Sequence, residues 1–231
     1  MNKPIQIFAN KYVSIDWLLP IKGDKLGHVE KPSPSVAIVG SSGILLDKEY
    51  GKDIDSHDIV MRFNMARVKG FEKHVGSKTH IRILNGHTFA GTGDPNRFEK
   101  YNPNFLMNEC SQEHFILKDS NSNEFIRGVL MNTNHNYCNF FDNQFRDYCE
   151  GIIQGGTSVG FMGLMFTILA LNPSKVNCYG FDHGEIEAKR RHYWEAVKDT
   201  DNWKTGQGHA YNREKEIFQH YAENNTIKIW K

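Results

Sequence analysis

The sequence contains few cysteines, and their spacing matches no common site. None of the four forms a C-x-x-C pair, which argues against a structural zinc site or a thiol redox motif. Cys138 and Cys149 are close enough in the chain for a disulfide to stay an open alternative. We expect free thiols instead, in a protein of a reducing compartment.

Long hydrophobic runs are also missing. The most apolar segment, GFMGLMFTILAL at 160–171, is shorter than the roughly 20 residues that span a bilayer, and it is typical of a buried helix. The first residues, MNKPIQIFANKYVSIDW, contain neither a continuous hydrophobic signal region nor a small-residue cleavage pattern. We therefore expect a cytoplasmic protein without a membrane span.

No charge of one sign dominates. The formal net charge is +1, and lysines and arginines form no long run, so no electrostatic footprint for nucleic acid or an anionic membrane is present. With 231 residues, 39% hydrophobic and 24% charged, the chain is long and apolar enough to fold around a core as one α/β domain.

Strand-like and helix-like patterns alternate after residue 35. Alternation of this kind predicts an α/β fold with a mainly parallel sheet flanked by helices. We expect residues 1–35, which end in the breaker KPSPS, to be an irregular leader, and residues 36–231 to form one catalytic domain. Strands are expected at 36–40, 58–64, 79–85, 104–108, 114–118, 175–181 and 226–230, and helices at 138–149, 158–171 and 210–223.

The first strand ends in a Gly/Ser turn, VAIVGSSG at 36–43, which can present backbone N–H groups to a phosphate. The G-x-G-x-x-G pattern of a dinucleotide site and the G-K-[ST] pattern of a P-loop are both absent. Phosphate binding and a plain strand-to-helix turn are equally open from this segment alone.

A second candidate is the start of the apolar helix, GGTSVGF at 155–161. Thr157 or Ser158 is suited to cap this helix, and the free N–H groups of its first turn are suited to an anion. A well-capped core helix is the alternative.

Two histidines beside aromatic residues, His192 and His209, are candidates for acid–base chemistry near neutral pH. The alternative is a pair of partly exposed histidines packed on aromatic rings. Asp53-Ile54-Asp55 has the D-x-D pattern of metal-dependent transferases, but its position before a strand favours turn and cap roles, so we expect no metal there.

Together these segments resemble the animal-type sialyltransferases, glycosyltransferase family 29, which carry four ordered sialylmotifs. The large motif resembles residues 36–84, where D-S-H-D, R-x-N-x-A, G-F-E and V-G-S-K-T stand in order. The small motif resembles TSVGFMGLMFTILALNPSKVNCYGF at 157–181. Motif III resembles HYWE at 192–195, and the very small motif resembles the H-x4-E spacing from His209 to Glu214.

The resemblance implies a Rossmann-like, single-domain variant of the GT-A type. It also implies inverting transfer of sialic acid from CMP-sialic acid to a glycan hydroxyl, without metal or other cofactor. His209 would be the general base and His192 would bind the donor phosphate. Glu214 would orient the surrounding loop and helix, and Gly180 would support the small motif. The implied donor-binding residues are Ser41, Ser42, Gly43, Asn64, Ser158, Val159, Gly160 and Tyr193.

Several positions depart from the family pattern. Val36 and Pro173 stand where the family has its paired cysteines, and the membrane anchor is missing, which fits a cytoplasmic protein of prokaryotic or viral origin. Ser41 replaces an asparagine that contacts the donor. The alternatives are a CMP-Kdo transferase and a non-catalytic CMP- or glycan-binding protein; a nicotinamide oxidoreductase is disfavoured. Acceptor specificity is expected in residues 86–150 and around Trp203–Gly208.

Overall fold

The protein is represented by a computed structural model, which describes residues 22–23, 29–30, 33–85, 110, 113–118, 138–141, 143–183, 192–195 and 209–230. Within these ranges seven strands form one sheet in the order β7-β6-β5-β4-β3-β8-β9, and every neighbouring pair is parallel. The α/β class and the parallel sheet predicted from the sequence are confirmed. The strands are β3 (Ser35–Val39), β4 (Ile59–Phe63), β5 (Ile81–Leu84), β6 (His114–Leu117), β7 (Cys138–Phe140), β8 (Lys175–Tyr179) and β9 (Lys228–Trp230).

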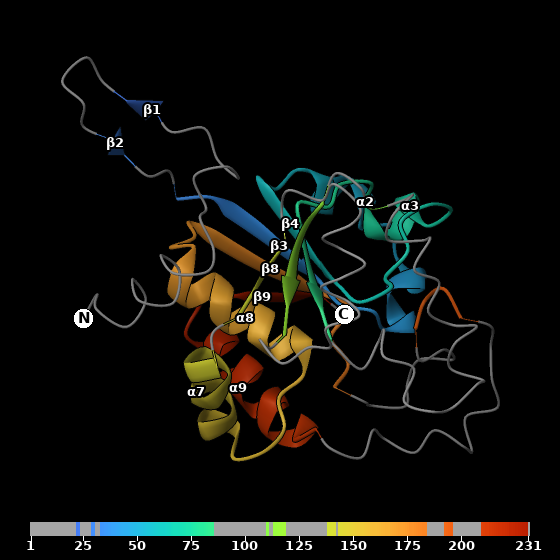
Figure 1. Cartoon of the computed structure of the whole chain (residues 1–231). Helices are drawn as coiled ribbons and strands as arrows, with labels where there is room; N and C mark the ends of the chain where they lie inside the picture. Colours follow the sequence, from blue (N-terminus) through green and yellow to red (C-terminus); the bar gives the residue numbers. More distant parts are fainter. Residues whose placement is uncertain are drawn as a thin grey trace, which may run out of the picture.

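The helices lie on both faces of this sheet (Figure 1). Longer helices α7, α8 and α9 cover one face, and the short elements η1, α2 and α3 cover the other. Their bounds are η1 (Gly43–Asp47, a 3-10 helix), α2 (Gly51–Asp55), α3 (Glu72–Val75), α7 (Asn143–Ile153), α8 (Val159–Ala170) and α9 (Tyr211–Glu223). The expected helices at 158–171 and 210–223 are confirmed as α8 and α9.

Two sequence predictions need correction. The helix expected over 138–149 is wrong in its first part, because Cys138–Phe140 is the edge strand β7 and helix α7 begins only at Asn143. Three residues are too few for a strand periodicity to be recognised. The leader expected to be irregular contains the antiparallel pair β1 (Lys22–Gly23) and β2 (Val29–Glu30). The strand expected at 104–108 lies outside the described residues.

One face of the sheet packs a mainly apolar layer. Alternate residues of the strands, such as Val36, Ile38 and Met61, are fully buried against the helices. Helix α8 is apolar almost all round, as expected for a helix that is buried on nearly every side. The hydrophobic effect on this side is the main stabilising contribution to the fold.

The opposite face is more polar. Ala37, Val39 and Val60 form an apolar patch with residues of η1, α2 and α3, but Arg62 and Arg82 are also completely buried on this side. Buried arginines need hydrogen-bond partners, because an unpaired charge in the interior is strongly unfavourable.

Cys149 and Cys178 are free thiols, so Cys149 forms no disulfide. Burial raises the pKa of Cys149 to about 12 and that of Cys178 further still. These thiols are therefore unreactive core residues. Among the helices described, none has both the length and the apolar character needed to cross a bilayer.

Candidate active site

The order of the strands marks one place as a ligand crevice. From β3 the chain continues outward through β4 to β7, whereas β8 and β9 lie on the other side of β3. In open parallel sheets, ligands bind outside the carboxyl ends of the strands at such a point of reversal. The Gly/Ser turn 40–43 follows β3 there, and residues 180–183 follow β8.

The two turns are held together by backbone hydrogen bonds. Gly40 N–H donates to Tyr179 O (2.7 Å), and Ser42 N–H donates to Gly180 O (3.3 Å). Gly180 has a φ of +68°, which favours glycine, and a Cβ on it would lie 2.6 Å from the Leu45 side chain. The η1 helix can therefore approach β8 only across a residue without a side chain, and the supporting role of Gly180 in the site stays a prediction.

The three predicted contacts of the Gly/Ser turn differ in accessibility. Ser42 is nearly buried; its hydroxyl accepts from Ile44 N–H (3.3 Å) and donates to the Asp182 carboxylate (2.5 Å). Gly43 is buried at the start of η1, whereas Ser41 is partly exposed. Asp182 was missed by the sequence analysis, although its place directly after a strand at the crevice is a usable signal.

Asn64 follows β4 at the same edge of the sheet. Its φ of +47° is in the left-handed region, which asparagine tolerates better than most residues. Its Oδ1 accepts from Asn85 N–H (2.9 Å), which links the ends of β4 and β5. Asn64 is therefore held in a special backbone conformation next to the predicted nucleotide site.

The turn 192–195, which carries His192, docks on the Gly/Ser turn, because Tyr193 N–H donates to Ser41 O (3.0 Å). His192 is half-buried, its ring stacks on Trp194 at 4.7 Å, and its Nδ1 lies 2.9 Å from Glu195 Oε1. The carboxylate fixes the orientation of the imidazole. The predicted phosphate ligand His192 is thus joined to the predicted donor-binding turn.

Tyr193 itself points into the core. Its side chain is completely buried and its hydroxyl donates to Arg67 O. Burial raises the pKa of Tyr193 to about 12, although Arg62 and Arg82 lower it. A direct contact of Tyr193 with the donor stays a prediction, and it requires this side chain to leave the core.

The start of α8 is capped as expected, by Ser158, whose hydroxyl accepts from Phe161 N–H (3.1 Å). The Glu214 carboxylate accepts from both the N–H and the hydroxyl of Ser158, each at 2.7 Å. The Glu214 carboxylate therefore occupies both the N–H and the hydroxyl of Ser158, and a donor contact of the helix start at Ser158, Val159 and Gly160 stays a prediction. Val159 and Gly160 are buried behind it, and a Cβ on Gly160 would lie 2.9 Å from the Phe181 ring.

Glu214 is buried on α9, and this burial raises its pKa above the usual range, while the Ser158 hydrogen bonds and the Lys118 charge lower it. Lys118, which follows β6, donates from Nζ to Thr157 O (2.6 Å). Glu214 thus joins α9 to the start of α8, and its orienting role in the reaction stays a prediction.

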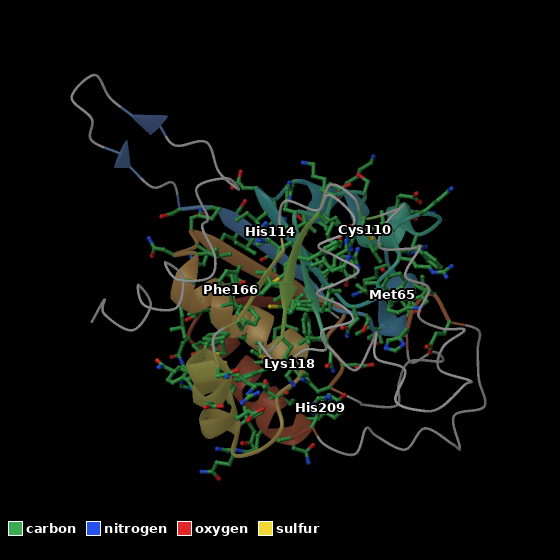
Figure 2. All side chains as sticks on the ribbon, viewed as in Figure 1. Met65, Cys110, His114, Lys118, Phe166 and His209 are labelled. Atoms are coloured by element: carbon green, nitrogen blue, oxygen red, sulfur yellow. The ribbon has the colours of Figure 1, made fainter. Side chains whose placement is uncertain are left out.

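His209 lies two residues before α9, half-buried, with its ring 5.4 Å from that of Tyr211 (Figure 2). Ala210 N–H donates to Gly156 O (3.3 Å). This bond places His209 beside the loop that leads into α8. The predicted site residues therefore form two groups, one at the Gly/Ser turn and one at the start of α8, and Phe181 packs on Gly160 between them.

The D-x-D residues are used within the fold, as expected. Asp53 accepts from the Tyr179 hydroxyl, and Asp55 accepts from Ser77 N–H and Lys78 N–H (both 2.9 Å at Oδ1). These bonds hold α2 against β8 and against the turn before β5. In the described ranges no three His, Cys, Asp or Glu side chains form a cluster suited to a metal ion.

A sequence model of glycosyltransferase family 29 (sialyltransferase) matches residues 18–226. The chain belongs to glycosyltransferase family 29. The match reaches beyond the motifs quoted above on both sides and includes much of the expected leader. The fold is similar to that of a mammalian sialyltransferase solved in complex with Gal-beta-1-3GalNAc-ortho-nitrophenol, with a TM-score of 0.61 and 24% identity over 94% of this chain and 76% of that one.

Similar segments occur in longer members of the family. Beta-galactoside alpha-2,6-sialyltransferase 2 is 50% identical over 56 residues in Rattus norvegicus (24% of this chain, 11% of that protein) and 55% identical over 51 residues in Homo sapiens (22% and 10%). Beta-1,6-galactosyltransferase GALT29A of Arabidopsis thaliana is 53% identical over 59 residues (26% and 15%). The aligned segments thus span only about a tenth to a seventh of these relatives. Animal and plant sources give no support to the expected prokaryotic or viral origin.

Proposed function

We propose that this family 29 protein transfers sialic acid from CMP-sialic acid to a hydroxyl of a glycan, with inversion and without a metal ion. The observation that carries the proposal is the junction at the carboxyl ends of β3 and β8. There the Gly/Ser turn, the turn with His192 and the end of β8 are hydrogen-bonded to one another. A nucleotide held at this edge would have its phosphate within the crevice that such sheets use for nucleotides.

The residues have distinct roles in the proposed reaction. His209 takes the proton from the acceptor hydroxyl as its oxygen bonds to the anomeric carbon of the donor. The bond from that carbon to the phosphate oxygen breaks, and CMP leaves with the electron pair. His192, held by Glu195 and Trp194, stabilises the phosphate charge, and Ser41, Gly43 and Asn64 contact the nucleotide. Ser42 and Glu214 act by positioning these groups.

The experiment supplies CMP-sialic acid and a galactoside acceptor, with and without EDTA, and detects CMP and the sialylated product by mass spectrometry. We expect equal product formation in both cases, and a loss of about 10²–10⁴-fold in turnover for His209→Ala. The matched control is His220→Ala, an exposed histidine on α9, the helix that follows His209, and it should leave turnover unchanged. Full dependence on added divalent metal, or wild-type turnover in His209→Ala, would contradict the mechanism.

A second donor is favoured by one observation, since a plant relative with a similar segment is named a galactosyltransferase. The same assay therefore includes UDP-galactose. It also includes CMP-Kdo, to test a CMP-activated donor other than CMP-sialic acid. Product from UDP-galactose alone would replace sialic acid as the transferred sugar. Tight CMP binding with no transfer from any donor would favour a non-catalytic nucleotide-binding protein.

The remaining expectations stay proposals. We propose that residues 36–231 act as one catalytic domain and that the partners are a CMP-activated sugar and a glycan, with no nucleic acid. A cytoplasmic location is proposed from the free thiols of Cys149 and Cys178 and from Val36 and Pro173 at the positions of the family's disulfide.

A further inference from the structure

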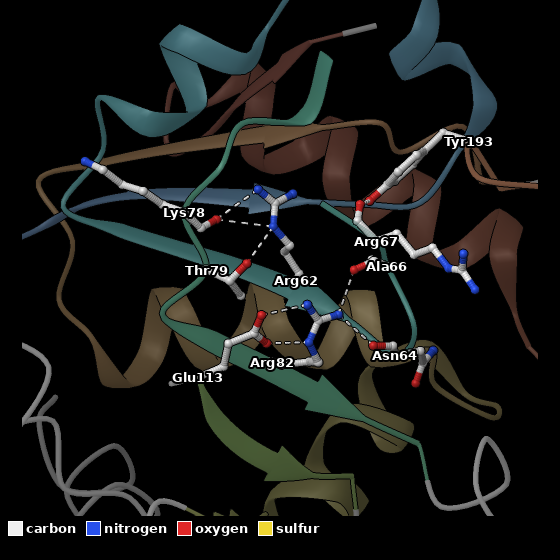
Figure 3. A network of polar contacts seen from close by, with 9 residues as sticks. All are labelled: Arg62, Asn64, Ala66, Arg67, Lys78, Thr79, Arg82, Glu113 and Tyr193. Carbon is white, nitrogen blue, oxygen red and sulfur yellow. Dashed lines mark hydrogen bonds and ion pairs between the residues drawn. The ribbon is translucent and has the colours of Figure 1, made fainter. Parts of the chain in front are cut away.

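Two buried arginines lie directly beside each other on the polar face of the sheet. Arg62 of β4 and Arg82 of β5 are register partners, and both are fully buried (Figure 3). Although their positions are equivalent, their hydrogen bonds run to different parts of the chain. The difference indicates that Arg62 stabilises the fold, whereas Arg82 positions part of the site.

Arg62 bonds to the last residue of α3 and to the connection between α3 and β5. It donates to the carbonyl oxygens of Val75 (2.6 Å) and Lys78 (2.9 Å) and to Thr79 Oγ1 (2.9 Å). Its Nη1 is buried without a hydrogen-bond partner, and burial lowers the pKa of Arg62 to about 10. No carboxylate bonds to it among the residues described here. None of these partners belongs to the Gly/Ser turn, so Arg62 is a structural residue.

Arg82 is paired and bonds to the site. Its Nε and Nη2 donate to the two oxygens of Glu113, at 2.5 and 2.9 Å, which is the bidentate geometry that fixes both side chains. Burial alone would lower the pKa of Arg82, but the Glu113 carboxylate raises it well above the usual range. The guanidinium is thus permanently charged and held in one orientation.

The remaining nitrogen of this guanidinium is directed at the loop that follows β4. Nη1 of Arg82 donates to Asn64 O (2.8 Å) and to Ala66 O (2.9 Å), so one donor group holds two carbonyl groups of the loop that begins with the left-handed residue Asn64. The next carbonyl, that of Arg67, accepts from the Tyr193 hydroxyl. Figure 3 shows Glu113, Arg82, the loop 64–67 and Tyr193 as one continuous set of contacts.

This chain of bonds reaches both predicted parts of the donor site. Tyr193 N–H donates to Ser41 O in the Gly/Ser turn, and His192 is its immediate neighbour. We propose that Arg82 and Glu113 are positioning residues that set the loop 64–67 for donor binding and, through Tyr193, the placement of His192. The proposal rests on the proposed function for its kinetic consequence only.

The first test measures amide hydrogen exchange and needs no activity. Its variants are Glu113→Gln, which removes the charge and keeps the shape, and Arg82→Lys, which cannot span Glu113 and the loop together. We expect exchange at least about tenfold faster at the amides of Asn85 and Tyr193, which are bonded to Asn64 Oδ1 and Ser41 O. The matched control Arg62→Lys should leave these two amides unchanged.

The second test measures CMP binding by calorimetry and transfer kinetics with the same proteins. A misplaced loop should weaken CMP binding and raise the donor KM by about tenfold or more, with a lower kcat and an unchanged acceptor KM. Arg62→Lys should lower the unfolding temperature without this kinetic pattern. Absence of CMP binding and transfer in the wild type would refute the proposed function, whereas the exchange data would still decide the positioning role.

Two outcomes of these experiments would overturn the proposal. One is unchanged exchange at Asn85 and Tyr193 in both pair variants, with each variant folded. The other is an equal change in Arg62→Lys, which would mean that any buried arginine on this face has the same general effect on the fold.

Discussion

The two faces of the sheet are built from different interactions. On the face covered by α7, α8 and α9, buried side chains such as Ile38, Met61 and Leu164 pack without any charge. On the other face, Arg62, Arg82 and Tyr179 are buried with hydrogen bonds to carbonyl groups or carboxylates. Apolar contacts are non-directional and stabilise the fold as a whole, whereas charged hydrogen bonds fix the position of particular loops.

The loops fixed in this way are those of the proposed donor site. The connections after β3 and β4 and the turn with His192 all contact the polar face or its edge. The polar side of the sheet therefore positions the loops that carry Ser41, Asn64 and His192, and the other side contributes mainly to stability, with the Glu214–Ser158 bonds at the start of α8 as the exception. Substitutions on the two sides of the sheet should therefore differ in whether they change stability or the site.

Leu164→Ala removes a fully buried side chain from the apolar face. We expect the free energy of unfolding to fall by about 2–5 kcal/mol, because the lost burial and the remaining cavity both destabilise the fold. Denaturant titration measures this loss, and CMP affinity of the folded protein should stay within about twofold. A loss of CMP affinity without a loss of stability would contradict this role of the apolar face.

Gly51→Ala and Gly163→Ala each add one methyl group at a crowded glycine, the first on the polar side of the sheet and the second on the apolar side. A Cβ on Gly51 would lie 2.0 Å from Glu72 O of α3, whereas one on Gly163 would lie 2.6 Å from the Phe63 ring. Side chains move more readily than backbone, and alanine also favours the helix at 163. We expect Gly51→Ala to destabilise the protein by about 1–3 kcal/mol and Gly163→Ala to destabilise it less. Thermal unfolding of both variants measures the two losses of stability, and a larger loss for Gly163→Ala would contradict this expectation.

Asp55→Asn tests a partly exposed bond on the polar side. Burial raises the pKa of Asp55, but hydrogen bonds from Lys78 and Ser77 more than offset this and lower it below the usual value. The ionised form is therefore favoured by folding, and its contribution is present above the unfolded pKa and lost as the pH falls through the folded one. We expect a loss of about 1 kcal/mol at neutral pH that disappears in acid. A loss that does not depend on pH would assign the effect to packing.

Glu214→Gln should have the smallest effect and the opposite pH dependence. Burial raises the pKa of Glu214, so the protonated form is favoured by folding. The stability that this provides is present below the unfolded pKa and is lost as the pH rises through the raised folded value. Relative to Glu214→Gln, the wild type should therefore lose stability from acid to neutral pH, by about 1 kcal/mol or less. Denaturant midpoints of both proteins across this pH range measure the difference in stability. If the wild type instead gained stability relative to Glu214→Gln as the pH rises, Glu214 would be stabilised as a carboxylate.

Much of the apolar face could be predicted from the sequence. Residues 158–171 are long and apolar enough to indicate a buried helix, and Ser158 is a residue type that caps helices. The strands β3, β4, β5, β6 and β8 were also found, because each is a run of buried residues between turn signals. Boundaries shifted by one or two residues, as local patterns do not define helix and strand ends.

The polar face could not be predicted in the same way. Nothing in the pattern IVMRF distinguishes a buried Arg62 from an exposed one, since its partners are carbonyl groups reached only after α3 folds over the sheet. The pairing of Arg82 with Glu113 joins residues 31 positions apart, and the buried Tyr193 hydroxyl bonds to a carbonyl 126 positions away. Local propensity does not report contacts of this kind. The same holds for Asp182 beside Ser42.

A crystal structure of the protein with CMP tests the central claim most directly. We expect CMP at the carboxyl ends of β3 and β8, with its phosphate near the Gly/Ser turn and His192 and with Asn64 in contact with the nucleotide. CMP bound elsewhere on the protein, with this edge of the sheet empty, would contradict the account.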